Sequence, residues 1–508
     1  MSVEMRRCRQ LLSTALVCCH FLTSCTLAND QPQWGQRHTR NMVSSETNLI
    51  DSFNPATGKN VKWVASLGSE TWATPVVAGG KVLIGTNNDP PRDPRHKGDR
   101  AILLCLDEKD GRFLWQLVVP KLGPDPYLDW PRDGLVSPAS IEGDRAYVIS
   151  NRNEVICLDM EGQRNGNDGP YKDEGRHMVP DDTTKSELIS SDADIIWLFD
   201  IRNQAGTYPH DAAHGSILID GDFLYVNTSN GVDNTHRRIR APDGPSLIVL
   251  DKKTGRLVAR DNEGIGPRIF HNTWSSPAMG FVNGRKLVFF AGGDGIVYAF
   301  EALESAPPAG VVENLKRVWR FDCDPTAPKE NVHQYIGNRS ESPSNIKSTP
   351  VFYKDRVYVT VGGDIWWGKN KAWLKCIDAT KSGDITASGL IWSYDLNRHC
   401  CSTPSIYDGM VFVADCGKQV HCVDAQTGKV CWTHDAEGEI WASTLVADGK
   451  VYIGTRRGDF WILAASREKR IISKIELDSD TAGTPVAANG VLYVTTMRKL
   501  YALQKQRQ

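Results

Sequence analysis

The feature of this sequence that most constrains its fold is a short unit, rich in β-forming residues, that recurs along the chain. Residues 399–432 contain a complete copy. In it, the turn pair Asp408-Gly409 precedes the apolar run 410–414, and the alternating run 420–424 leads through a second turn to Trp432. Runs of this kind between glycine-containing turns predict strands. The unit therefore predicts four short antiparallel strands.

Further copies keep the same order of strands and turns, beginning near residues 73, 137, 215, 276, 349, 441 and 483. The last copy stops at 500–503 without its final strand, whereas residues 56–63 supply a turn and a strand with no first half before them. Pairing the two ends would remove an exposed sheet edge. Because such repeats are typical of propellers, we predict an all-β chain: an eight-bladed β-propeller of four-stranded antiparallel blades, closed by the N-terminal strand.

The N-terminal region predicts export. Three arginines precede the apolar run 11–22, which is too short to cross a bilayer and is typical of a signal peptide over residues 1–28. Residues 22–25 resemble a lipobox, which would make Cys25 a lipidated residue, while residues 26–28 resemble an ordinary cleavage site. Both alternatives predict a periplasmic or lipid-anchored protein, with a lead-in at 29–50 and the propeller at 51–508.

Charge and cysteine spacing exclude several classes of partner. The formal net charge is −2 and no basic run occurs, so we expect no nucleic-acid binding and no membrane contact beyond the lipid anchor. Four cysteines precede the repeated aspartate by two residues, at Cys105, Cys157, Cys376 and Cys422. This spacing belongs to the repeat and indicates small packed side chains, so no metal site is predicted.

The segments that lead into the innermost strands should meet near the propeller axis. They carry polar and aromatic residues that are candidates for a ligand-binding funnel: Trp72, Asp133, His210, Asp211, His214, His271, Asn272, Trp274, Arg398, His399 and Trp441. A pocket that joins flat aromatic surfaces to a few polar groups suits a small ligand. The alternative is that these side chains hydrogen-bond between blades and plug the channel.

The repeat resembles a known family at residues 422–432, with an echo at 105–115. Both resemble the tryptophan-docking repeat of pyrroloquinoline quinone (PQQ) propellers. That resemblance implies a structural role, packing against a neighbouring blade, for Trp63, Trp115, Trp197, Trp319, Trp392 and Trp432. The fold serves both quinoprotein alcohol dehydrogenases and the propeller lipoprotein of the bacterial outer-membrane Bam complex, so it does not by itself specify a function.

Two functions follow from the resemblance. The leading expectation is a binding or scaffold module of the cell envelope that has protein partners and no cofactor. The alternative is a periplasmic dehydrogenase of alcohols or sugars that uses PQQ with Ca²⁺. In the alternative, the quinone would stack on Trp72, Trp274 or Trp441 and meet Arg398, and the catalytic base would be Asp133 or Asp211.

A pair of adjacent cysteines is relevant to the dehydrogenase alternative. Cys400-Cys401 resembles the adjacent cysteines that form a ring beneath the quinone in those dehydrogenases, but here the pair lies in a late blade. Two packed thiols are the preferred interpretation.

Overall fold

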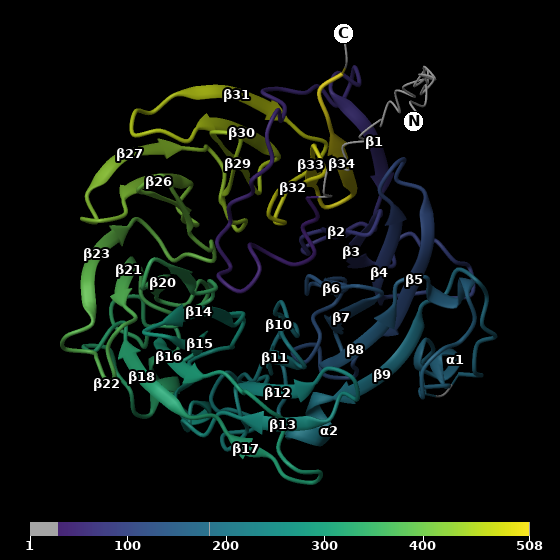
Figure 1. Ribbon diagram of the computed structural model, residues 1–508, viewed down its shortest axis with the longest axis horizontal. Helices are drawn as coiled ribbons and strands as arrows, with labels where there is room; N and C mark the ends of the chain where they lie inside the picture. The colour runs from purple at the N-terminus through teal and green to yellow at the C-terminus, as the bar shows by residue number, and fades with distance from the viewer. Residues whose placement is uncertain (1–28, 182, 507–508) are drawn as a thin grey trace, which may run out of the picture.

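Short strands separated by turns form the framework of the chain that the computed structural model describes, residues 29–181 and 183–506. They form eight sheets arranged radially around one axis (Figure 1). In the first blade, β2 (Val76–Ala78) lies innermost, followed outward by β3 (Lys81–Asn87), β4 (Arg100–Asp107) and β5 (Phe113–Pro120). All pairs within this blade are antiparallel.

The remaining blades repeat this order. They are β6 (Ser140–Glu142), β7 (Arg145–Ile149), β8 (Glu154–Asp159) and β9 (Asp194–Asp200); β10 (Leu218–Asp220), β11 (Phe223–Asn227), β12 (Leu247–Asp251) and β13 (Leu257–Arg260); β14 (Ala278–Val282), β15 (Arg285–Ala291), β16 (Ile296–Glu301) and β18 (Arg317–Asp322); β19 (Val351–Tyr353), β20 (Arg356–Gly362), β21 (Ala372–Asp378) and β23 (Leu390–Leu396); β24 (Ser405–Tyr407), β25 (Met410–Ala414), β26 (Gln419–Asp424) and β27 (Val430–Asp435); β28 (Leu445–Ala447), β29 (Lys450–Gly454), β30 (Asp459–Ala464) and β31 (Ile471–Glu476); and β32 (Val486–Ala488), β33 (Val491–Thr495), β34 (Lys499–Leu503) and β1 (Val61–Ser66). Short fifth strands, β17 (Glu313–Asn314) and β22 (Gly383–Asp384), extend two of the sheets.

The two ends of the chain meet in the last of these blades. The strand β1 pairs antiparallel with β34, so that Trp63 lies opposite Ala502. Because this pairing gives the eighth sheet its fourth strand, no blade is left with only three strands. The predicted eight-bladed β-propeller and its closure by the N-terminal strand are confirmed.

Helices play a small part in the described chain. The segments are α1 (Glu174–His177), α2 (Ile201–Ala205), η1 (Gly162–Arg164), η2 (Gly266–Arg268) and η3 (Val332–Tyr335). Among the described residues, no helix has the length and apolar character needed to span a membrane. The predicted signal peptide and Cys25 lie outside the described residues.

Six tryptophans join neighbouring blades by the same contact. Each indole N–H donates to a backbone carbonyl of the next blade: Trp63 to Glu108, Trp115 to Met160, Trp197 to Lys252, Trp319 to Ala379, Trp392 to Ala425 and Trp432 to Ser466. Within its own sheet, each faces a small residue, as Trp115 faces Cys105 and Trp392 faces Cys376. The repeated cysteines therefore occupy positions where a larger side chain would crowd the indole.

Glycines in the turn before the outermost strand of a blade pack against the tryptophan of the preceding blade. Gly428 has φ of +73°, and a Cβ there would lie 2.8 Å from the Trp392 ring. The equivalent Gly58 has φ of +75° and nothing within 4 Å of its Cβ position. The difference arises because the preceding blade has Ser473, opposite Ile462, at the position of the tryptophan.

We expect Gly428→Ala to destabilise the protein more than Gly58→Ala. Both substitutions place a Cβ in left-handed backbone, which costs about 1–2 kcal/mol. Gly428→Ala must also displace a packed indole, which adds about 1–3 kcal/mol. Urea denaturation of the two variants measures the difference. Equal losses would contradict an interlocking role for the Trp392 contact.

The lead-in segment has a role that the sequence did not reveal. It crosses the centre of the ring (Figure 1) and hydrogen-bonds to residues in or beside the innermost strand of every blade, namely Val77, Ile141, Ser216, Met279, Phe352, Ile406, Val446 and Ala487. Arg40 lies at its middle and is fully buried. Its guanidinium donates to the carbonyls of Trp34, Ser216 and Pro277, each at 3.0 Å. The lead-in therefore closes one end of the axial channel.

Candidate functional site

A cavity of about 460 Å³ lies on the propeller axis, next to the lead-in segment. Trp34 of the lead-in and segments from most of the blades form its wall. Its lining is mainly aromatic, with a few ionisable groups: Trp72, Tyr127, Trp130, Asp133, Asp211, His214, His236, His271, Trp274, Lys347, Trp366, Trp367, Cys401 and Trp441. The size and the mixture of side chains are those of a small-molecule site.

Four tryptophans form a connected part of this wall. The rings of Trp72 and Trp441 lie 5.6 Å apart, and the Arg456 guanidinium lies over both, 4.7 and 4.8 Å from their centroids. Trp366 packs edge-on against Trp441 and Trp274, at 5.8 Å from each. The indole N–H groups of Trp72, Trp274 and Trp441 have no hydrogen-bond partner in the described chain.

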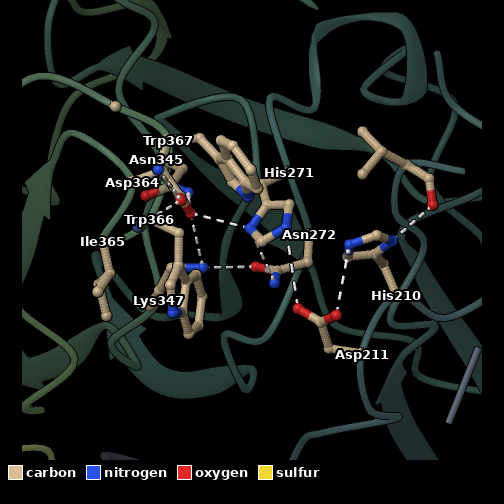
Figure 2. Close-up of polar contacts among 12 residues, drawn as sticks. His210, Asp211, His271, Asn272, Asn345, Lys347, Asp364, Ile365, Trp366 and Trp367 are labelled. Atoms are coloured by element: carbon tan, nitrogen blue, oxygen red, sulfur yellow. Dashed lines mark hydrogen bonds and ion pairs between the residues drawn. The ribbon is translucent and has the colours of Figure 1, made fainter. Parts of the chain in front are cut away.

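A buried ion pair forms one side of the cavity. Lys347 Nζ lies 3.1 Å from Asp364 Oδ2, donates to Asn272 Oδ1 at 2.6 Å, and lies 4.3 Å from the Trp274 centroid (Figure 2). Burial would raise the pKa of Asp364, but Lys347 and His271 hold that pKa well below its usual range. The other oxygen, Asp364 Oδ1, accepts the backbone N–H groups of Trp366 and Trp367. This carboxylate thus orients two aromatic wall residues as well as the lysine.

Two cavity carboxyl groups have raised pKa values. Burial raises the pKa of Asp133 to about 8, an effect that the charge of Lys121 opposes in part. Burial also raises the pKa of Asp211, which lies 3.8 Å from His271 Nε2. At neutral pH, Asp133 therefore holds its proton. It suits the role of acid or hydrogen-bond donor, whereas the sequence had suggested a base.

The raised pKa of Asp133 predicts a pH-dependent stability. A group with a folded-state pKa of about 8 and an ordinary unfolded value binds its proton more tightly in the folded protein, so stability falls as pH rises between about 4 and 8. Relative to Asp133→Asn, we expect the wild type to lose up to about 1.4 kcal/mol per pH unit there and to level off above. Denaturation of both proteins across pH 4–9 tests this. A constant difference would contradict the raised pKa.

Three histidines from separate segments meet at the cavity wall, and two of them, His236 and His271, line the cavity. His210 follows α2, His236 lies between β11 and β12, and His271 follows η2. Their ring centroids lie 4.7–5.2 Å apart. Burial, with the neighbouring His271 and His236, lowers the pKa of His210 to about 2, and burial likewise lowers the pKa of His236. His214, on another part of the cavity wall, has its pKa lowered by burial to about 4.

The structure brings together most, but not all, of the residues expected in the funnel. Lining the cavity are Trp72, Asp133, Asp211, His214, His271, Trp274 and Trp441. His210 and Asn272 are fully buried and contact lining residues. Arg398 is exposed and His399 is buried, and neither lines the cavity. Arg456, rather than Arg398, contacts Trp72 and Trp441, two of the tryptophans expected to stack on a ligand.

Sequence reasoning missed several lining residues: Trp34, Tyr127, His236, Trp366 and Trp367. Tyr127 lies in the segment that leads into the innermost strand β6, whereas Trp34, His236, Trp366 and Trp367 lie in segments that do not precede an innermost strand. The adjacent Trp366-Trp367, in a glycine-rich loop between β20 and β21, carried a usable signal, because two large aromatics in a loop need a surface to pack on.

The adjacent cysteines do not form a ring. Both are free thiols: Cys400 Sγ lies 2.9 Å from the carbonyl oxygen of Ala414, away from the cavity lining, while Cys401 lines the cavity. Cys400 is therefore a packed thiol, as the preferred interpretation expected, whereas Cys401 is only half-buried.

The cavity residues do not fit a quinone held with calcium. Ca²⁺ takes six to eight oxygen ligands, whereas the carboxyl groups that line the cavity are those of Asp133 and Asp211, and Asp364 is committed to Lys347, His271 and two backbone N–H groups. The cavity tryptophan pairs are tilted by 43–85°, so no two of these paired rings form a parallel-walled slot. At the cavity wall, three imidazoles, those of His210, His236 and His271, converge on one point.

Comparison with known proteins supports the repeat and the fold. The family model of the outer membrane protein assembly factor BamB matches residues 370–471. A 1-butanol dehydrogenase (cytochrome c) of Thauera butanivorans is 31% identical over 105 residues, and a quinohemoprotein alcohol dehydrogenase of Comamonas testosteroni is 28% identical over 108. These matches cover 18% and 19% of this chain but 15% of each relative.

Solved structures agree in fold. A europium-containing methanol dehydrogenase superposes with a TM-score of 0.57 at 11% identity, covering 93% of this chain and 98% of the other. The chain is thus an eight-bladed β-propeller with a PQQ-like repeat over residues 370–471. It is similar in this repeat both to an assembly factor and to quinoprotein dehydrogenases, and such similarity does not transfer an activity.

Proposed function

We propose that this chain is an exported small-molecule-binding propeller whose axial cavity takes a carbohydrate or similar ring-shaped polyol. The observation that carries the proposal is the connected wall of tryptophan rings, Trp72, Trp441, Trp366 and Trp274, on a cavity of about 460 Å³. Flat aromatic surfaces joined to a few hydrogen-bonding groups suit a small ring-shaped ligand.

The remaining lining suits the same ligand class. A sugar ring has C–H faces that pack on aromatic rings and hydroxyl edges that both donate and accept. Around the cavity, Asp133 donates, Asp211 accepts, and Lys347 supplies a fixed cation. Sugars and alcohols are also the substrate class that the dehydrogenase alternative implied, although the site does not fit that cofactor.

Tryptophan fluorescence gives a direct test. The full chain is titrated with a panel of mono- and disaccharides, with PQQ plus Ca²⁺ as the comparison. We expect a saturable fluorescence change with at least one sugar, confirmed by calorimetry, and a loss of affinity of about fivefold or more for Trp441→Ala, since aromatic contacts contribute about 1 kcal/mol or more.

Trp373→Ala is the matched control, because Trp373 packs against a blade core outside the cavity. Equal effects of the two variants, or binding of the quinone alone, would overturn the proposed ligand class. Failure of every sugar to bind would overturn the proposal itself.

A scaffold role in the envelope is the second candidate, and a separate observation favours it. The segment that matches the assembly-factor model contains exposed apolar residues on the outer strands of three successive blades: Leu390, Ile391, Val430 and Ile471. Exposed apolar side chains on outer strands suit contact with a partner protein.

The test of the scaffold role is a pull-down from envelope extract with wild type and with Val430→Lys/Ile471→Lys. We expect a partner that the wild type retains and the variant loses. Retention of the same proteins by both would exclude this surface.

A further inference from the structure

The three buried histidines are arranged differently from a purely packed cluster. His210 Nε2 lies 3.1 Å from His236 Nε2, and one ring nitrogen from each of His210, His236 and His271 lies within 4.8 Å of the others. Asp211 faces the same point, with its oxygens 3.5 Å from His210 Nε2 and 3.8 Å from His271 Nε2 (Figure 2). We call these four residues the histidine cluster.

Hydrogen bonds determine which nitrogens carry protons. His210 Nδ1 lies 2.8 Å from the carbonyl oxygen of Val232, which can only accept, so the proton is on Nδ1 and His210 Nε2 accepts a hydrogen bond from His236 Nε2 at 3.1 Å. A metal ion would replace the proton that these two Nε2 atoms share. His271 Nδ1 lies 3.1 Å from the Asp364 carboxylate, and its Nε2 has no hydrogen-bond partner. Ligating histidines commonly have one ring nitrogen anchored to a carbonyl or carboxylate, as His210 and His271 do.

The distances also suit a shared metal ion. Two imidazoles bound to one ion at about 2.0–2.1 Å hold their nitrogens about 3.0–3.4 Å apart, which matches the contact between His210 and His236. The third imidazole and the carboxylate would need to move inward by on the order of 1 Å to complete a tetrahedral site. Aromatic rings cover the three histidines: Tyr127 over His210, Trp367 over His236 and Trp366 over His271.

We propose that the histidine cluster binds one divalent first-row transition-metal ion, such as Zn²⁺, at the wall of the axial cavity. Three imidazole nitrogens and one carboxylate oxygen are ligands for zinc, copper, nickel or iron rather than for calcium. Asp211, His236 and His271 also line the cavity, so the ion would lie beside it. Asp211 is shared with the proposed sugar site, but metal binding does not require a bound sugar.

Zinc titration of the full chain, after removal of metal with a chelator, tests the site. We expect Zn²⁺ to bind in a 1:1 ratio in competition with a chromophoric chelator, and Ca²⁺ not to compete. His236→Ala should weaken Zn²⁺ binding by about 100-fold or more, since removing even an outer-shell partner costs 10–100-fold. The matched control is His214→Ala, which removes a cavity histidine outside the cluster and should leave Zn²⁺ binding unchanged.

Two results would overturn the site: wild-type affinity in His236→Ala, or equal losses in the two variants. X-ray absorption of the Zn²⁺-loaded wild type provides a second measurement that does not depend on the folding of a variant. We expect three imidazole ligands, and a count of one or none would overturn the proposal. Because metal binding is read without any sugar, its failure is distinguishable from failure of the proposed function.

Discussion

Replacement of Lys347 by methionine should cost about 3–5 kcal/mol of unfolding free energy, because it leaves a buried carboxylate without its cation. Asp364 is fully buried, and Lys347 Nζ lies 3.1 Å from it. Methionine fills a similar volume, so the loss of charge rather than a cavity causes the effect. Chemical denaturation of wild type and variant measures it.

The chain offers two controls for this substitution. Lys316 pairs with Glu301 at 2.9 Å on the surface, and Lys316→Met should cost less than about 1 kcal/mol. The double variant Lys347→Met/Asp364→Asn should recover part of the loss, because the amide oxygen still accepts the Trp366 and Trp367 N–H groups without an uncompensated charge. A loss below 1 kcal/mol for Lys347→Met would contradict the buried pair.

Loss of Arg40 should have a comparable effect through a different mechanism. Arg40→Ala leaves the carbonyls of Trp34, Ser216 and Pro277 without their buried donors, and each bond to a charged group contributes about 1.5–3 kcal/mol. We expect a loss of about 4 kcal/mol and a lower thermal midpoint. Arg40→Lys should restore less than half, since one ammonium cannot reproduce the planar fork of donors.

Arg37 provides the control in the same segment. It is exposed and pairs with Glu142 at 2.8 Å, so Arg37→Ala should change stability by less than about 1 kcal/mol. Differential scanning calorimetry of the three variants compares them. If Arg40→Ala melted like Arg37→Ala, the lead-in would not hold the centre of the ring together.

The fold could be predicted because its determinants are local and repeated. Turn pairs such as Asp408-Gly409, the strand periodicity and the spacing to Trp432 recur in nearly every unit, so each copy supports the assignment of the others. Ring closure was also predictable, since the surplus strand near Trp63 complements the strand missing after residue 503. The role of the lead-in segment could not be predicted, because its contacts with eight different blades leave no periodic pattern in the sequence.

Some residues of the candidate site could also be predicted from the sequence, and others could not. Residues such as Trp72, Trp274 and Trp441 could be named from sequence, because they precede innermost strands and every such segment points to the axis. The exposed position of Arg398, the raised pKa of Asp133 and the meeting of His210, His236 and His271 depend on loops from separate blades. Sequence alone determined the repeat, the number of blades and the closure, since these follow from short-range periodicity. Tertiary structure alone decided which side chains share a cavity and what their protonation is, because distances across the axis and burial have no local signal in the chain.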